Sequence, residues 1–144
     1  VAKSASRHPI GLVQLGKLES ANAQRREIVA QYGRAFSDLS WFRKPVEKSY
    51  SRSAYHAYVA RAQDRDGLIE HLNHHGISAS VHYKPNHLYS VYAPYRCDLP
   101  VTESVWQELV TLPLYPNMTD EEVAQVIEAV RCFQPNGRRL PTDP

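Results

Sequence analysis

Four side chains that can bind anions or exchange protons are crowded into one short segment: His82, Tyr83, Lys84 and His87. The segment comes at the end of a predicted strand, and strand ends are where α/β proteins usually bind ligands. The imidazole and phenol groups can hydrogen-bond to hydroxyl or phosphate oxygens, and the ammonium group can pair with a phosphate. We therefore predict that these four residues bind substrate. The structural alternative is that Tyr83 packs inside the domain and His82 caps the strand end.

The rest of the sequence supplies no complete catalytic centre. It contains no glycine-rich phosphate loop, no nucleophile paired with a base, and none of its five lysines lies in a cofactor-anchoring context. His71 and His75 have a spacing that suits a metal ion, but no third ligand accompanies them, so a solvated helix face is preferred. Cys97 and Cys132 lack metal spacing and are expected to be free thiols. The sequence therefore indicates one part of an active site, with no metal.

Aromatic and basic residues outside this segment leave several alternatives open. Tyr89, Tyr92 and Tyr95 can stack on a nucleotide base or fill a gap beside a partner subunit. Trp106 lies at helical spacing and is expected in the core. The arginine pair 25–26 can meet a phosphate, but a solvated face or an ion pair with a nearby glutamate of the same helix is preferred.

Composition narrows the class of protein. The chain has 144 residues, 42% of them hydrophobic, which is enough for one domain with a real core. The net charge of +2 is too small to indicate binding to nucleic acid or to a membrane surface. No apolar run approaches the length of a membrane span and no signal-peptide pattern opens the chain, so we predict a cytoplasmic protein.

Hydrophobic periodicity and capping residues predict a series of alternating helices and strands. In chain order we expect a helix over 10–39, a loop over 41–53, a strand over 55–60, a short helix capped by Asp64 or Asp66 and ended by Gly76, a strand over 77–83, an irregular turn and loop over 86–95, a helix capped by Thr102, a short strand over 111–114, and a last helix that opens with a capping box at Thr119.

This order predicts an α/β fold with two layers, in which a short sheet is covered by helices on one face. The first helix is polar in its middle, which favours a connection between two packing surfaces. We therefore divide the chain into a divergent N-terminal segment (1–9), a long connecting helix (10–39), a small domain (40–133) and a disordered tail (134–144).

Segments between Ile10 and Phe133 also share their order and spacing with one enzyme family. They are Ile10–Leu15 with Lys17–Leu18, Arg25–Ile28 with Tyr32, Leu72 with Gly76–Ile77, His82–Tyr83 with Pro85 and His87, Leu99–Pro100, Leu112–Pro116, and the helix from Thr119 to Val130. Together they resemble the C-terminal region of the DegT/DnrJ/EryC1/StrS aminotransferases, over nearly the whole chain.

The resemblance implies a function that composition alone does not. The chain would be the C-terminal small domain of an aspartate-aminotransferase-type fold, in an enzyme that moves an amino group from glutamate to a nucleotide-linked keto sugar. Pyridoxal phosphate (PLP) would be held as a Schiff base by a lysine of a large domain. The functional unit would be a homodimer with its active sites at the subunit interface, and the segment from His82 to His87 would bind the nucleotide sugar.

The sequence departs from the family in two places. None of its lysines lies in the family's Schiff-base motif, and residues 1–9 differ from the family's segment before Ile10. We therefore expect this chain to be inactive without a large domain or chain that binds PLP. The alternative is a non-catalytic remnant, a regulatory subunit or a nucleotide-sugar-binding module that works with a partner chain.

Overall fold

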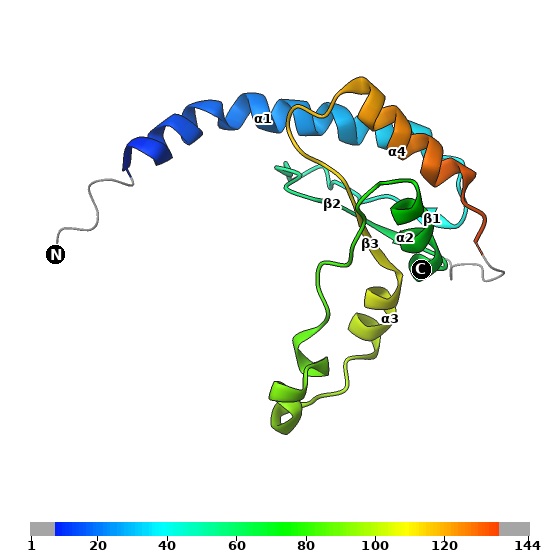
Figure 1. Cartoon of the computed structure of the whole chain (residues 1–144). Helices are drawn as coiled ribbons and strands as arrows, with labels where there is room; N and C mark the ends of the chain where they lie inside the picture. The colour runs from blue at the N-terminus through cyan, green and yellow to red at the C-terminus, as the bar shows by residue number, and fades with distance from the viewer. Residues whose placement is uncertain (1–7, 136–144) are drawn as a thin grey trace.

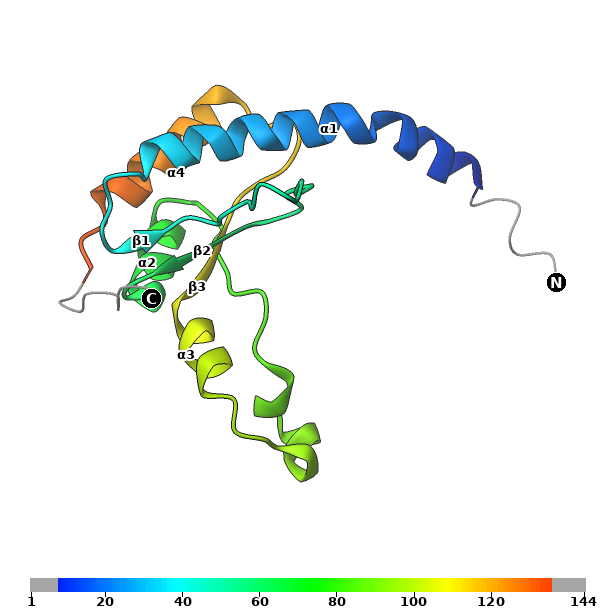
Figure 2. The same ribbon diagram turned by 180° about the vertical axis from the view of Figure 1, so that it is seen from behind.

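The computed structural model describes residues 8–135 and contains a small sheet with helices packed on one side and a further helix beyond its end (Figure 1). The elements are α1 (His8–Ala35), β1 (Phe42–Arg43), β2 (Tyr58–Ala62), α2 (Arg65–His74), the 3-10 helices η1 (Asn86–Leu88) and η2 (Ser90–Tyr95), α3 (Pro100–Glu108), β3 (Leu109–Leu112) and α4 (Asp120–Cys132). Figures 1 and 2 show α1 and α4 side by side above the sheet, and η1 and η2 on an arm that projects away from it.

The sheet is antiparallel, with the strand order β1-β2-β3. Along β2 the side chains alternate, so that Tyr58, Ala60 and Ala62 are buried while Val59 and Arg61 are half-buried. This is the period of a strand with one face on the core. Ala60 lies opposite Val110 of β3, which is also buried. The two-layer α/β fold is therefore confirmed.

Aromatic side chains from α1 and the sheet form the centre of the core. The rings of Tyr32 and Tyr58 pack edge to face with their centroids 5.1 Å apart, and those of Phe36 and Phe42 pack in the same way with their centroids 5.0 Å apart. The Tyr32 hydroxyl donates to the carbonyl of Pro113 at 3.1 Å. Burial raises the pKa of Tyr32 and of Tyr58, so both stay protonated at neutral pH. These contacts fix the second half of α1 on the domain.

The first half of α1 makes no such contacts. Ile10, Leu12 and Leu15 are 65%, 69% and 65% exposed, and this end of the helix extends past the body in Figure 2. The predicted long helix is present, although it ends at Ala35 rather than at residue 39. No helix of the described residues is long and apolar enough to cross a membrane.

The capping signals of the sequence correctly located two helices. Asp64 caps α2 by accepting a hydrogen bond from the Gly67 amide at 3.2 Å, and Gly76 follows this helix with a φ of 73°. At the start of α4, Thr119 accepts from the Glu122 amide while the Glu122 carboxylate accepts from the Thr119 amide. This is the predicted capping box.

The predicted strand over 77–83 is wrong, because only Ser80 pairs there, in an isolated bridge with Thr111. In an antiparallel ladder the next hydrogen-bonded pair would join Ser78 to Pro113, and proline has no amide hydrogen to donate. Beyond Ser80 the chain leaves the sheet and leads into the arm (Figure 1). Ile77 and Ala79 are buried, but Tyr83 is 77% exposed, so it does not pack inside the domain.

Four other boundaries differ from expectation. The strands predicted over 55–60 and 111–114 lie at Tyr58–Ala62 and Leu109–Leu112. The predicted loop over 41–53 begins with β1, because Phe42 is buried in the core and pairs with Ala62. The helix expected to be capped by Thr102 begins at Pro100 instead, since proline fits the first turn of a helix without losing a hydrogen bond. The predicted tail lies almost entirely outside the described residues, and the four-part division of the chain stays a prediction.

Candidate functional site

A groove of about 680 Å³ lies on the sheet face opposite the helices, and we call it the sheet groove. Its floor is apolar and includes Val59 of β2 together with Leu112 and Pro113 at the end of β3. Its lining also includes side chains with polar groups: His56, Ser78, Ser80, His82, Tyr83 and Thr111. An apolar hollow with a few convergent polar groups is the usual form of a small-molecule site.

His82 and Tyr83 of the predicted site line this groove. Nδ1 of His82 lies 3.3 Å from the Ser80 hydroxyl, and the imidazole meets the Tyr83 ring edge to face at 5.0 Å. Ser80 is itself fixed, because its backbone exchanges two hydrogen bonds with Thr111 of β3. The Nε2 atom of His82 makes no hydrogen bond to the described residues, which leaves it available to a ligand.

Lys84 and His87 do not line the groove. The Lys84 ammonium lies 5.2 Å from the centre of the Tyr89 ring, a cation–π contact on the arm. His87 is buried, and its Nε2 lies 2.9 Å from the Glu103 carboxylate of α3. The structure thus brings together two of the four predicted site residues and places the other two on the arm, where His87 attaches η1 to α3.

The aromatic and basic side chains for which the sequence left alternatives open lie outside the sheet groove. Tyr89, Tyr92 and Tyr95 are exposed on the arm. Trp106 is half-buried, with the Arg65 guanidinium 5.8 Å from its ring, so its expected place in the core is wrong. Arg26 pairs with Glu47, which lies on the loop after β1 rather than on its own helix. His71 and His75 belong to no metal site among residues 8–135.

Sequence reasoning missed the hydroxyl groups of the groove and His56. Ser78 and Ser80 alternate with the buried Ile77 and Ala79, so the period of two was a signal that they face away from the core. His56 precedes β2 by two residues, and its position at the groove depends on the path of the loop before it. Neither signal indicates by itself that these residues share a site.

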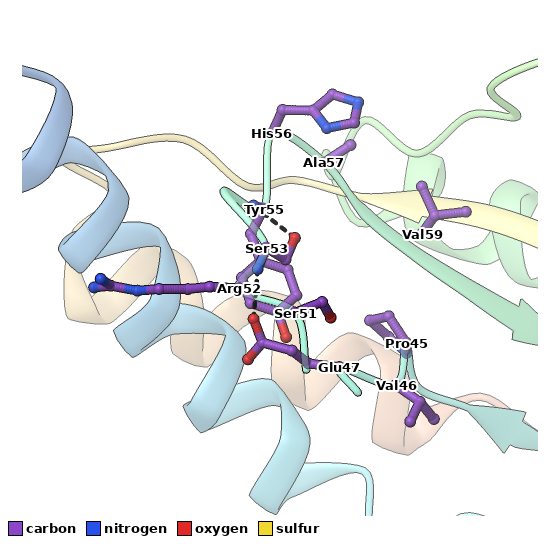
Figure 3. A pocket seen from close by; sticks show the side chains of 10 residues that line it. All are labelled: Pro45, Val46, Glu47, Ser51, Arg52, Ser53, Tyr55, His56, Ala57 and Val59. Atoms are coloured by element: carbon purple, nitrogen blue, oxygen red, sulfur yellow. Dashed lines mark hydrogen bonds between the residues drawn. The ribbon is translucent and has the colours of Figure 1, made fainter. Parts of the chain in front are cut away.

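A second hollow of about 390 Å³ adjoins the sheet groove, and we call it the loop pocket (Figure 3). It is formed by the loop between β1 and β2, including Glu47 and Ser53, and it shares His56, Ala57 and Val59 with the sheet groove. Figure 3 shows Glu47 and Ser53 directed toward one another, with His56 on the far side of the loop. His56 therefore lies between the two hollows.

The described lysines do not fit a cofactor that is held as a Schiff base. Lys44 donates its ammonium hydrogen to the carbonyl of Gly33 at 3.2 Å, and Lys84 lies over Tyr89. Lys17 and Lys48 are exposed, and none of these four side chains lines the sheet groove. Among residues 8–135, therefore, no lysine is placed at the sheet groove to hold such a cofactor.

Comparison with known proteins gives consistent results. The model of the DegT/DnrJ/EryC1/StrS aminotransferase family matches residues 6–131. The spore coat polysaccharide biosynthesis protein SpsC of Bacillus subtilis is 32% identical over 133 residues, which are 85% of this chain and 34% of that protein. The aminotransferase TlmJ from Streptoalloteichus hindustanus has 33% identity and a TM-score of 0.80, over 85% of this chain and 34% of TlmJ.

A further solved relative contains the cofactor. Spr1654 from Streptococcus pneumoniae, in its PLP form, is 32% identical with a TM-score of 0.77, over 83% of this chain and 33% of that one. The chain thus spans about a third of the length of these relatives. The match of sequence, spacing and fold over nearly all described residues shows that this chain belongs to the DegT/DnrJ/EryC1/StrS aminotransferase family.

Proposed function

We propose that this chain is the C-terminal small-domain part of a PLP-dependent nucleotide-sugar aminotransferase, and that it is inactive without a large domain that carries the cofactor lysine. The complete enzyme transfers an amino group from glutamate to a nucleotide-linked keto sugar. The observation that carries the proposal is a family match that covers only about a third of each relative, in a chain whose described lysines do not fit the cofactor.

The sheet groove is the part of the substrate site that this chain contributes. The Ser80 hydroxyl holds one nitrogen of the His82 ring, so the other can hydrogen-bond to a sugar hydroxyl or a phosphate oxygen. The Tyr83 ring beside it can donate through its phenol, and the apolar floor can contact the carbon face of the sugar. Lys84 on the adjoining arm is a candidate partner for the diphosphate, and His87 positions that arm through Glu103.

Two exposed apolar surfaces support the presence of a partner. The first half of α1 exposes Ile10, Leu12 and Leu15, the arm exposes Tyr95 at 80%, and the start of α3 exposes Val101 at 75%. Exposed apolar patches of this kind mark interaction sites. The proposal assigns these surfaces to the large domain and to a second subunit of a cytoplasmic homo-oligomer. The same patches favour the alternative function, a non-catalytic regulatory or binding module that works with a partner chain.

Binding of a nucleotide sugar by the chain tests this function. We expect UDP-glucose or dTDP-glucose to shift the histidine ring signals in NMR spectra, with the largest changes at His82. Substitution His82→Ala should weaken binding by about tenfold, the value of one good hydrogen bond to a charged ligand. His74→Ala is the matched control, since His74 is an exposed histidine on α2 that does not line the groove. Equal effects of the two substitutions, or no shifts at all, would refute the site.

A further inference from the structure

We propose that Arg26 locks the loop 44–57 onto α1, and that this lock fixes His56 at the rim of the sheet groove as a further substrate-binding residue. The inference rests on the proposed function for the class of ligand, a nucleotide-linked sugar. It adds one contact residue, His56, and one positioning residue, Arg26, neither of which belongs to the predicted site.

The Arg26 guanidinium makes a forked contact with the loop. Its two terminal nitrogens lie 3.1 and 2.6 Å from the two carboxylate oxygens of Glu47, and one of them also donates to the carbonyl of Ser53 at 2.8 Å. The guanidinium also lies 5.4 Å from the centre of the Tyr55 ring. A bidentate arginine–carboxylate pair fixes orientation as well as distance. Arg26 therefore holds three points of the loop at once.

Glu47 continues this network inside the loop. Its carboxylate accepts a hydrogen bond from the Ser53 amide, and the Ser53 hydroxyl accepts one from the Tyr55 amide at 3.0 Å. Figure 3 shows these two bonds as dashed lines beneath His56. The contact with Arg26 lowers the pKa of Glu47, so the carboxylate is charged at neutral pH. The contacts run from α1 to the residue immediately before His56.

The backbone at Tyr55 explains why the loop needs such support. Tyr55 has a φ of 45°, in the left-handed region that costs a non-glycine residue energy. Such a conformation persists only where the surrounding contacts determine it. Here those contacts are the Ser53 hydroxyl on the Tyr55 amide and the Arg26 guanidinium against its ring. The backbone conformation at Tyr55 determines the direction in which the His56 side chain projects from the loop.

His56 is the side chain that this arrangement presents. It is exposed, it lines both the loop pocket and the sheet groove, and Figure 3 shows its ring turned away from Glu47. Its two ring nitrogens make no hydrogen bond to the described residues, so both are available to a hydroxyl or phosphate oxygen of the ligand. Because His82 lines the same groove, the two imidazoles can contact one ligand together.

The lock is tested first without ligand, by amide hydrogen exchange of the chain. The substitution Arg26→Met keeps an unbranched side chain but removes the forked contact, and it should speed exchange at Ser53 and Tyr55. Arg131→Met is the matched control, because Arg131 makes a similar forked contact with Asp38, at 2.8 and 3.0 Å, between α4 and the turn after α1. The lock is overturned if Arg26→Met leaves amide exchange at Ser53 and Tyr55 unchanged. It is also overturned if Arg131→Met speeds exchange at these two residues as much as Arg26→Met does.

The role of His56 is tested by a double-mutant cycle with UDP-glucose and dTDP-glucose as probes. His56→Ala and Arg26→Met should each weaken binding by roughly threefold to tenfold. Their combination should weaken it no further than the larger single effect, because a loose loop no longer presents His56. Arg26→Met combined with His82→Ala should instead multiply the two losses. Unchanged affinity in either single variant, or losses that multiply for Arg26 and His56, contradicts the inference.

The outcomes separate this inference from the proposed function. If the unmodified chain binds a probe with shifts at His82 but none at His56, the further inference fails and the proposed function stands. If the chain binds neither probe, the proposed function fails and the role of His56 falls with it. The exchange experiment then still decides whether Arg26 orders the loop.

Discussion

Replacement of Leu72 by alanine is expected to lower the free energy of unfolding by about 2–5 kcal/mol. Leu72 lies on α2 with none of its surface exposed, and α2 packs against β2, β3 and α4. Truncation removes buried apolar surface and leaves a cavity that rigid neighbours on three elements cannot fill. The loss is a large fraction of the stability of a domain of this size.

Leu12 provides the matched control for this substitution. It is also a leucine in a helix, but it is 69% exposed on the first half of α1. The substitution Leu12→Ala should change the free energy of unfolding by no more than about 0.5 kcal/mol. Urea unfolding of both variants, followed by circular dichroism, measures the difference. Similar losses in the two variants would mean that the helices do not pack on the sheet as described.

Amino transfer is expected to be absent from this chain on its own, with PLP and glutamate supplied. The reason is that its described lysines are engaged or exposed away from the groove, and that the chain matches about a third of each relative. The rate at which glutamate converts PLP to its amine form can be followed by absorbance. It should equal the rate of free PLP with glutamate in the absence of protein.

The positive control for that experiment is a large domain that carries the cofactor lysine. Its addition, or its fusion before α1, should restore conversion, because the sheet groove and the cofactor then belong to one site. With the Leu72→Ala variant the conversion of PLP should be slower, since this substitution lowers the folded fraction. The Leu12→Ala variant tests whether the exposed start of α1 contacts the added domain. Conversion by the isolated chain above the free PLP rate contradicts the account.

The elements that the sequence predicted well are those with local signals. The capping box at Thr119, the Asp64 cap and the left-handed Gly76 depend on residues within a few positions of each other. The core positions of α4, such as Val123 and Val130, follow from helical spacing alone and are buried. Such patterns are readable because one helix face or one turn determines them.

The elements that sequence reasoning missed depend on distant parts of the chain. Strand pairing does not extend from Ser80 back to Ser78, because the residue opposite Ser78 would be Pro113, far along the sequence, which offers no amide hydrogen. Arg26 takes a partner 21 residues away on a loop, although glutamates lie closer on its own helix. For the same reason the sequence predicted His82 and Tyr83 as site residues but not His56. His56 lines the same groove only because the folded sheet brings the two segments together.

A native mass spectrum of the protein isolated from its own source tests the central claim most directly. The account predicts that this sequence is found with, or within, a larger polypeptide, in a complex whose mass includes bound PLP. A species that consists of this chain alone, with no cofactor mass and no partner, would contradict the assignment as a working part of an aminotransferase and would favour the non-catalytic alternative.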